Sequence, residues 1–140
     1  MPEAHKTGLY RAYALAADLV APLAYRKVAQ KLAQAKVPEK RIRERLGHTS
    51  QPRPDGDLIW FHAASVGESL SVLSLIETLG RLRREMSFRI TSGTPTSARL
   101  IEQRMPPRCR HQFAPLDAAP PLTRFLRHWH PTAAVVVESE

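Results

Sequence analysis

The segment Phe61-His62-Ala63-Ala64-Ser65-Val66-Gly67-Glu68 combines residue types that could hold an anion or a sugar. Ser65 and Glu68 have capping-box spacing, in which the serine caps a helix and the glutamate bonds back to the cap. Gly67 would let a ligand approach the backbone, and the free amides of a helix start attract anions. His62 could serve as an acid or a base. An ordinary helix cap and a strand histidine without any ligand explain the same residues.

A second turn of the same kind follows at Thr91-Ser92-Gly93-Thr94-Pro95-Thr96-Ser97. We expect Thr94 to cap a helix, with Pro95 at its first position and Thr96 beside it. Two such turns on one sheet edge would bring hydroxyls and unpaired amides together, which favours a phosphate or sugar site. Capping chemistry alone remains the alternative. We predict that the two turns face each other at the C-terminal edge of one parallel sheet.

Several carboxylates stand at positions where chemistry is conceivable. In Arg43-Glu44-Arg45-Leu46-Gly47, the two arginines are expected to hold Glu44 ionised, although a surface ion-pair cluster is the default interpretation. Asp117 is expected to be a helix cap or a ligand. Glu138 and Glu140 end a strand pattern and point to one face, where they could bind sugar hydroxyls or be solvated.

The elements that would position these residues alternate along the chain. Short apolar runs predict strands over residues 58–63, 88–91, 109–113 and 133–137. Helical patterns lie between them, over residues 67–84, 95–104 and 118–128. This alternation predicts an α/β domain with a Rossmann-like parallel sheet and flanking helices. Ligands of such sheets bind at the carboxyl ends of the strands, where both turns lie.

The N-terminal third is expected to be helical from about residue 9 to 32, with a break or kink near Pro22. Residues 26–45 are strongly basic, and the chain has a net charge of +8 and a pI near 10.4. Such a chain is attracted to nucleic acid, phosphorylated ligands or an anionic membrane surface.

A second, shorter helix is expected to start at Pro38 and to stop at Gly47, and a proline-rich loop follows over residues 51–56. We therefore expect residues 1–50 to form a helical, membrane-proximal segment and residues 51–140 to form the Rossmann-like domain. Because the chain stops at its clearest strand, we expect an open sheet edge and a sequence cut at a domain boundary.

Other classes of protein find no support. A single cysteine, Cys109, excludes an intrachain disulfide and fits a reducing compartment. The apolar residues 12–24 are interrupted by Asp18 and Pro22 and are too short for a membrane span of roughly 20 residues. The histidines lack zinc spacing, and there is no Walker motif, no GxGxxG and no RNA-binding signature.

The ordered set of motifs resembles the N-terminal domain of bacterial Kdo (3-deoxy-D-manno-octulosonic acid) transferases over nearly the whole chain. It comprises Leu9-Tyr10-Arg11-Ala12-Tyr13, Glu44-Arg45-Leu46-Gly47, His62 to Glu68, Thr94-Pro95-Thr96, Pro115-Leu116-Asp117 and Glu138-Ser139-Glu140. The sequence departs from the family before Glu44, where a Tyr-Arg-x-Arg-Trp-Gly run is usual. It departs again at Phe113-Ala114-Pro115-Leu116-Asp117, where Leu-Pro-Tyr-Asp is usual, and at Ser139, where the family carries threonine.

The resemblance implies the N-terminal half of a two-domain glycosyltransferase-B fold. This half would bind the acceptor, a phosphorylated lipid A precursor, and a C-terminal donor domain outside this sequence would bind CMP-Kdo. The implied reaction is an inverting transfer of Kdo in lipopolysaccharide biosynthesis, with no metal or other cofactor. We expect the 140-residue chain alone to be inactive.

The resemblance also implies roles for individual residues. Glu44 matches the catalytic base of the family, and Glu138, in preference to Glu140, matches a second important carboxylate. The expected substrate-binding residues are His62, Ser65, Val66, Gly67, Glu68, Thr94, Pro95, Thr96, Asp117 and Glu140.

The apolar residues 9–24 and the basic stretch behind them predict peripheral attachment to the cytoplasmic face of the bacterial inner membrane, through its anionic lipids. No nucleic acid is expected as a partner. The alternative is a non-catalytic basic α/β module that binds nucleotide or RNA. That alternative explains the charge and the capped turns, but it does not explain the ordered motifs.

Overall fold

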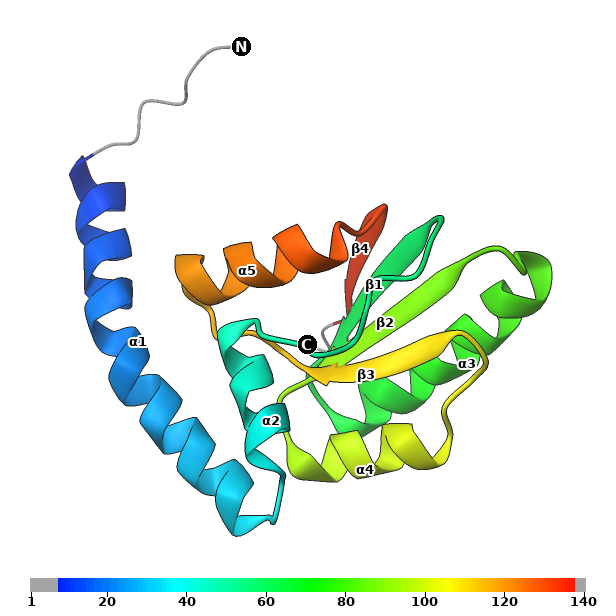
Figure 1. Ribbon diagram of the computed structural model, residues 1–140, viewed down its shortest axis with the longest axis horizontal. Helices are drawn as coiled ribbons and strands as arrows, with labels where there is room; N and C mark the ends of the chain where they lie inside the picture. The colour runs from blue at the N-terminus through cyan, green and yellow to red at the C-terminus, as the bar shows by residue number, and fades with distance from the viewer. Residues whose placement is uncertain (1–7, 138–140) are drawn as a thin grey trace.

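Four parallel strands form a single sheet at the centre of the protein (Figure 1). The computed structural model describes residues 8–137, with backbone alone for residues 8–10 and 12–21. The strands are β1 (Leu58–Ala63), β2 (Ser87–Ser92), β3 (Cys109–Phe113) and β4 (Ala133–Val137). Their order in the sheet is β3-β2-β1-β4, so β3 and β4 are edge strands. The prediction of an α/β fold with a Rossmann-like parallel sheet is confirmed.

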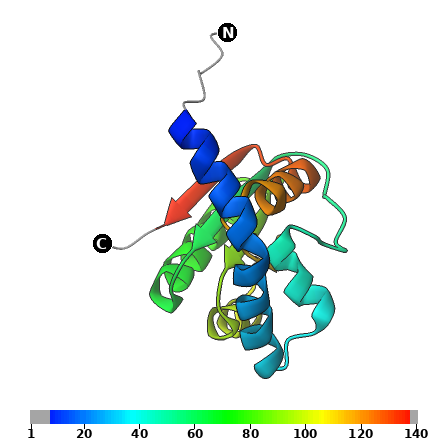
Figure 2. The ribbon, with the colours of Figure 1, turned by 90° about the vertical axis from the view of Figure 1, so that its left-hand side faces the viewer.

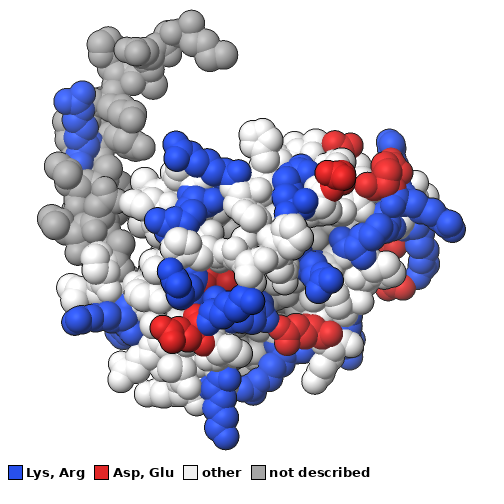
Figure 3. Space-filling model, viewed as in Figure 1, with Lys and Arg blue, Asp and Glu red and all other residues white. Residues whose placement is uncertain are grey.

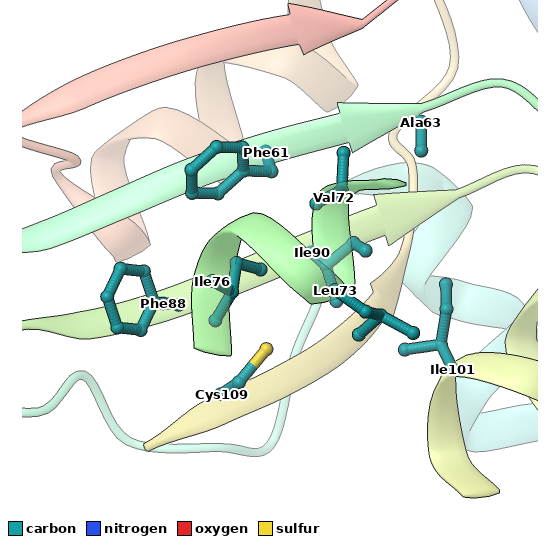
Figure 4. Close-up of a cluster of buried hydrophobic side chains, with 9 residues drawn as sticks. All are labelled: Phe61, Ala63, Val72, Leu73, Ile76, Phe88, Ile90, Ile101 and Cys109. Carbon is teal, nitrogen blue, oxygen red and sulfur yellow. The ribbon is translucent and has the colours of Figure 1, made fainter. Parts of the chain in front are cut away.

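Helices cover both faces of the sheet. They are α3 (Val66–Leu82), α4 (Pro95–Gln103) and α5 (Ala119–Trp129). Phe61, Phe88 and Ile90 point to the face that α3 and α4 cover, where they form the main core (Figure 4). Side chains of the opposite parity point to α5, and Trp60 packs against Phe125 with tilted rings whose centroids are 4.6 Å apart. Both faces are therefore apolar over much of their area, as the short apolar runs predicted.

The N-terminal helix α1 (Gly8–Gln34) lies to one side of the α/β body (Figures 1 and 2). It continues unbroken through Pro22, so the predicted break is wrong. A proline removes only one backbone N–H, and the surrounding alanines and leucines are strong helix formers. The C-terminal part of α1 packs on the body, where Leu32 is buried against Ile42 and Phe113.

Two short helical turns link α1 to the sheet, namely α2 (Glu39–Ile42) and the 3-10 turn η1 (Arg43–Leu46). Gly47 ends η1 in a left-handed conformation with φ 84°, as predicted for the helix stop. A Cβ on this glycine would lie 2.2 Å from the carbonyl oxygen of Pro121 at the start of α5. Only glycine therefore fits here, and its absent side chain lets η1 dock directly on α5.

The two polar turns leave the sheet at the same edge. β1 and β2 are parallel neighbours, with His62 in register with Thr91, and each turn follows directly after its strand. The prediction that both turns lie at the C-terminal edge of one sheet is confirmed. The carboxylates Glu138 and Glu140 lie outside the described residues. Among residues 8–137, no helix is both long enough and apolar enough to cross a bilayer.

Candidate functional site

Glu44 is a buried carboxylate on η1, with 7% of its surface exposed, and it lies against the end of β3. Its Oε1 accepts a hydrogen bond from the backbone N–H of Phe113 at 3.0 Å. Arg41, one helical turn earlier, donates to both carboxylate oxygens at 3.1–3.3 Å. Arg43 and Arg45 make no hydrogen bond to Glu44 in the described structure. The interpretation of Glu44 as a surface ion pair with its two neighbours is therefore wrong.

The pair formed by Arg41 and Glu44 closes the free edge of β3. On an edge strand, every second residue presents an unpaired N–H and C=O. Glu44 takes the N–H of Phe113, and Arg41 Nη2 donates to the C=O of His111 at 3.3 Å. The guanidinium carbon of Arg41 also lies 5.1 Å from the Phe113 ring centroid. The ion pair thus satisfies two backbone groups that a neighbouring strand would otherwise bond, and it fixes the carboxylate at the carboxyl end of the sheet.

Burial raises the pKa of Glu44 above its ordinary value, because an ionised carboxylate loses solvation in the interior. The hydrogen bonds from Arg41 and the Phe113 amide oppose this effect but do not cancel it. The expectation that neighbouring arginines lower this pKa is therefore wrong, since it neglected burial. A carboxylate with a raised pKa is a stronger base than an exposed one.

His111 extends this network into the sheet. Arg41 Nη2 lies 2.7 Å from His111 Nδ1, and His111 Nε2 lies 2.8 Å from Ser92 Oγ. Because a guanidinium only donates, Nδ1 must accept, and the ring is neutral with its proton on Nε2. Burial, and secondarily the charge of Arg41, lower the pKa of His111 to about 3. Glu102 on α4 forms a further ion pair with Arg41.

Arg45 connects η1 to the second turn. Its Nη1 donates to the carbonyl oxygen of Ala114 and lies 4.0 Å from where a Cβ on Gly93 would stand. The Arg45 carbonyl accepts the N–H of Leu116 at 2.8 Å, which ties η1 to the loop after β3. Its Nε is buried without a hydrogen-bond partner among the described atoms, and burial lowers its pKa. A fixed cation with a spare donor therefore lies beside the start of α4.

The first turn has the predicted caps and an open surface. Ser65 Oγ accepts the Glu68 N–H at 3.2 Å, and Glu68 Oε2 accepts the N–H groups of Ala64 and Ser65. The capping box is thus confirmed, and it ties the Glu68 carboxylate to backbone N–H groups of the turn. Ser65, Val66 and Gly67 are exposed, and nothing lies within 4 Å of a Cβ built on Gly67. His62 Nδ1 lies 2.9 Å from Thr91 Oγ1 on β2.

The second turn confirms Thr94 as the cap of α4 and Pro95 in its first turn, since Thr94 Oγ1 accepts the Ser97 N–H at 3.2 Å. Thr94 and Thr96 are exposed at this edge. The expectation that Asp117 caps α5 is wrong. The cap position is occupied by Ala118, which makes no side-chain hydrogen bond, and Asp117 is exposed.

No group of three His, Cys, Asp or Glu side chains among residues 8–137 could hold a metal ion. Cys109 is buried in the core, and burial raises the pKa of its thiol to about 12. The structure brings Glu44 and Arg45 close to the second turn. The first turn follows β1, which is two strands away from β3 in the sheet, and neighbouring strands are about 5 Å apart.

Sequence reasoning missed Arg41, His111 and Ser92, which hold Glu44 in place. Arg41 had a local signal, because a residue three positions before Glu44 on a helix lies on the same face. Nothing in the sequence links His111 or Ser92 to Glu44, since those contacts depend on the order of strands in the sheet.

The fold and site define a class, an α/β domain that gathers a buried carboxylate, fixed arginines and open helix starts at the carboxyl ends of parallel strands. Residues 40–140 match the family model described as 3-deoxy-D-manno-octulosonic-acid transferase (kdotransferase). The chain belongs to this family, and the matched region is its N-terminal transferase domain. The resemblance found in the sequence is therefore confirmed.

Individual relatives agree with this assignment. The chain is 34% identical over 132 residues to the probable mitochondrial 3-deoxy-D-manno-octulosonic acid transferase of Arabidopsis thaliana, covering 94% of this chain and 30% of the relative. It is 41% identical over 83 residues to the enzyme of that name from Rickettsia prowazekii, covering 59% and 18%. The Haemophilus influenzae enzyme is 32% identical over 94 residues, covering 67% and 22%. The chain spans less than a third of each relative's length, and no solved structure matches it significantly.

The neutral state of His111 predicts a specific acid sensitivity. Its pKa is lower in the folded chain than the ordinary value of about 6.5, so the unfolded chain takes up this proton first as the pH falls. The stability that depends on neutral His111 is complete above pH 6.5 and is lost as the pH falls towards 3. Between pH 7.5 and pH 5, we expect wild type to lose about 2 kcal/mol more unfolding free energy than His111→Gln.

Urea unfolding of both proteins at the two pH values measures this difference. His130→Asn, at an exposed position with a left-handed backbone, controls for the loss of a histidine in general. Parallel pH profiles for wild type and His111→Gln would show that His111 is not held neutral.

Proposed function

We propose that this chain is the acceptor-binding N-terminal part of a glycosyltransferase that moves Kdo from CMP-Kdo to a phosphorylated lipid A precursor. Its membership of the transferase family supports this proposal, and the buried carboxylate at the ligand edge of the sheet is the observation that carries it. The donor would be bound mainly by a second domain, and the transfer would be inverting and independent of metal ions.

Glu44 is the general base of the proposed reaction. Oε1 accepts bonds from both Arg41 and the Phe113 amide, whereas Oε2 accepts one bond, from Arg41 Nε at 3.2 Å. Oε2 therefore has free lone pairs with which to take the proton of the attacking sugar hydroxyl. The raised pKa favours that transfer, and the two anchors hold the oxygen in place. Glu138 is proposed as the second carboxylate on the family resemblance alone.

The two turns and Arg45 form the proposed acceptor surface. Arg45 supplies a cation, and the start of α4 supplies the N–H of Thr96, because Pro95 has none and that of Ser97 is bonded to Thr94; both suit a phosphate of the acceptor. Exposed hydroxyls of the turns suit the sugar. The proposed contacts are His62, Ser65, Val66, Gly67, Glu68, Thr94, Pro95, Thr96, Asp117 and Glu140. Among these, Glu68 already caps its own helix, so its proposed contribution is to hold the turn open.

Replacing Glu44 by glutamine tests the base directly. In a polypeptide of full family length that carries this sequence, we expect Glu44→Gln to lower turnover from CMP-Kdo by roughly 10²–10⁴, the usual contribution of general base catalysis. Acceptor affinity should change much less. The same substitution breaks the ion pair with Arg41, so we also expect a loss of about 1–3 kcal/mol in unfolding free energy.

Glu102→Gln is the matched control, because Glu102 also pairs with Arg41 but is exposed and lies on α4. It should leave turnover close to that of wild type. Turnover is measured well below both melting temperatures, so that the two folded variants are compared. Near-normal turnover in folded Glu44→Gln would reduce Glu44 to a structural residue of the β3 edge.

We further propose peripheral attachment to the cytoplasmic face of the inner membrane through α1 and the basic residues that follow. The face in Figure 3 carries more Lys and Arg than Asp and Glu, which suits an anionic surface. In vesicle flotation, binding should weaken as salt rises and as anionic lipid is withdrawn. Equal binding to neutral vesicles at high salt would exclude the electrostatic contribution.

A further inference from the structure

A second cationic site lies at the opposite end of the sheet from Glu44. The segment that joins η1 to β1 crosses the α5 side of the sheet (Figure 1), and His128 and Arg89 both bond to Gln51 within it. Between this segment and the first residues of β2 and β3 lies a cavity of about 490 Å³. Its walls include four arginines, namely Arg53, Arg89, Arg108 and Arg110. No Asp or Glu is among the described residues that line it.

Arg89 is the unusual member of this group. It is 3% exposed, yet no carboxylate is hydrogen-bonded to it in the described structure. Its guanidinium lies over the Trp129 ring at 3.8 Å, and Nη1 donates to Gln51 Oε1 at 3.1 Å. The Nε atom is buried without a partner. Burying a charge without an opposite charge is costly, and burial lowers the pKa of Arg89 to about 10.

Arg110 increases this cost. The parallel register of β2 and β3 places Arg89 directly opposite Arg110, and side chains in register point to the same face of a sheet. Arg110 is exposed and makes no hydrogen bond or ion pair with any residue of the described segment. Two like charges on neighbouring strands repel each other unless an anion lies between them.

The other two arginines are fixed by backbone carbonyls. Arg53 donates to the carbonyl oxygens of Trp129 and His130, and Arg108 donates to those of Gly80 and Arg83. These bonds occupy their donors, and those of Arg108 lie against α3, on the face of the sheet opposite to α5. Arg89 and Arg110 are therefore the arginines with donors to spare beside this cavity, and no acidic group lines it, a combination that suits an anion.

We propose that this cavity binds a phosphate group carried on a small organic moiety, with Arg89 and Arg110 as its charge partners. The volume is larger than a bare phosphate needs and is within the range of small-ligand pockets. The phosphate could come from a soluble ester or from a phospholipid headgroup, because both offer the same oxygens. This site is separate from Glu44 and does not rest on the proposed transferase activity.

Thermal unfolding with glycerol 3-phosphate, inorganic phosphate, or vesicles containing phosphatidylglycerol tests the proposal, at constant ionic strength. We expect glycerol 3-phosphate to raise the melting temperature of wild type in a saturable manner. Arg89→Met, which keeps an apolar chain over Trp129, and Arg110→Gln should each weaken the fitted affinity by about tenfold or more. Arg104→Gln, an exposed arginine at the end of α4 with the same charge change, should retain the wild-type affinity.

The arms of the experiment also identify the source of the phosphate. Saturable stabilisation by glycerol 3-phosphate assigns the site to soluble esters, whereas stabilisation by phosphatidylglycerol vesicles alone, lost in Arg110→Gln, assigns it to a lipid headgroup. If Arg89→Met does not fold, Arg110→Gln decides. No saturable effect of any probe on wild type, or equal losses in Arg104→Gln and Arg110→Gln, would overturn the proposal.

Discussion

The ion pair between Arg41 and Glu44 is the contact on which the architecture of the proposed acceptor edge depends. An edge strand presents unpaired backbone groups, and the last residues of the edge strand β3 present an N–H and a C=O of this kind. Arg41 and Glu44 satisfy one group each. The same contact therefore ends the sheet, docks the helical segment and places a carboxylate where substrates of α/β proteins bind.

The hydrogen bonds that close the β3 edge also explain why the Glu44 carboxylate can be buried. A lone buried carboxylate would become protonated, and a fully paired one would be a weak base. Glu44 lies between these limits, because two donors converge on Oε1 and leave Oε2 with a single bond. Gly47 contributes from the other side, since only glycine allows η1 to approach the start of α5. The segment around Glu44 is thus held from both β3 and α5.

The sequence was sufficient for the parts of the structure that local rules determine. Alternating apolar runs predicted the parallel sheet, and Ser65, Glu68 and Thr94 were placed correctly as caps because capping depends on residues three positions apart. Local rules failed where tertiary contacts decide. The charge of Glu44 was expected to follow from its neighbours in sequence, but it depends on burial against β3 and on Arg41. The pairing of Arg89 with Arg110 likewise exists only in the register of the sheet.

The pKa of Glu44 is the most direct measure of this account, and the amide of Phe113 can report it. That N–H donates to Glu44 Oε1, so its proton and nitrogen chemical shifts should follow the ionisation of the carboxyl group. In a pH titration by NMR, we expect a transition at Phe113 with a midpoint above the ordinary glutamate value of about 4.3, and its absence in Glu44→Gln. A midpoint at or below the ordinary value, or a transition that persists in Glu44→Gln, would contradict the claim that a buried, basic carboxylate closes the edge of β3.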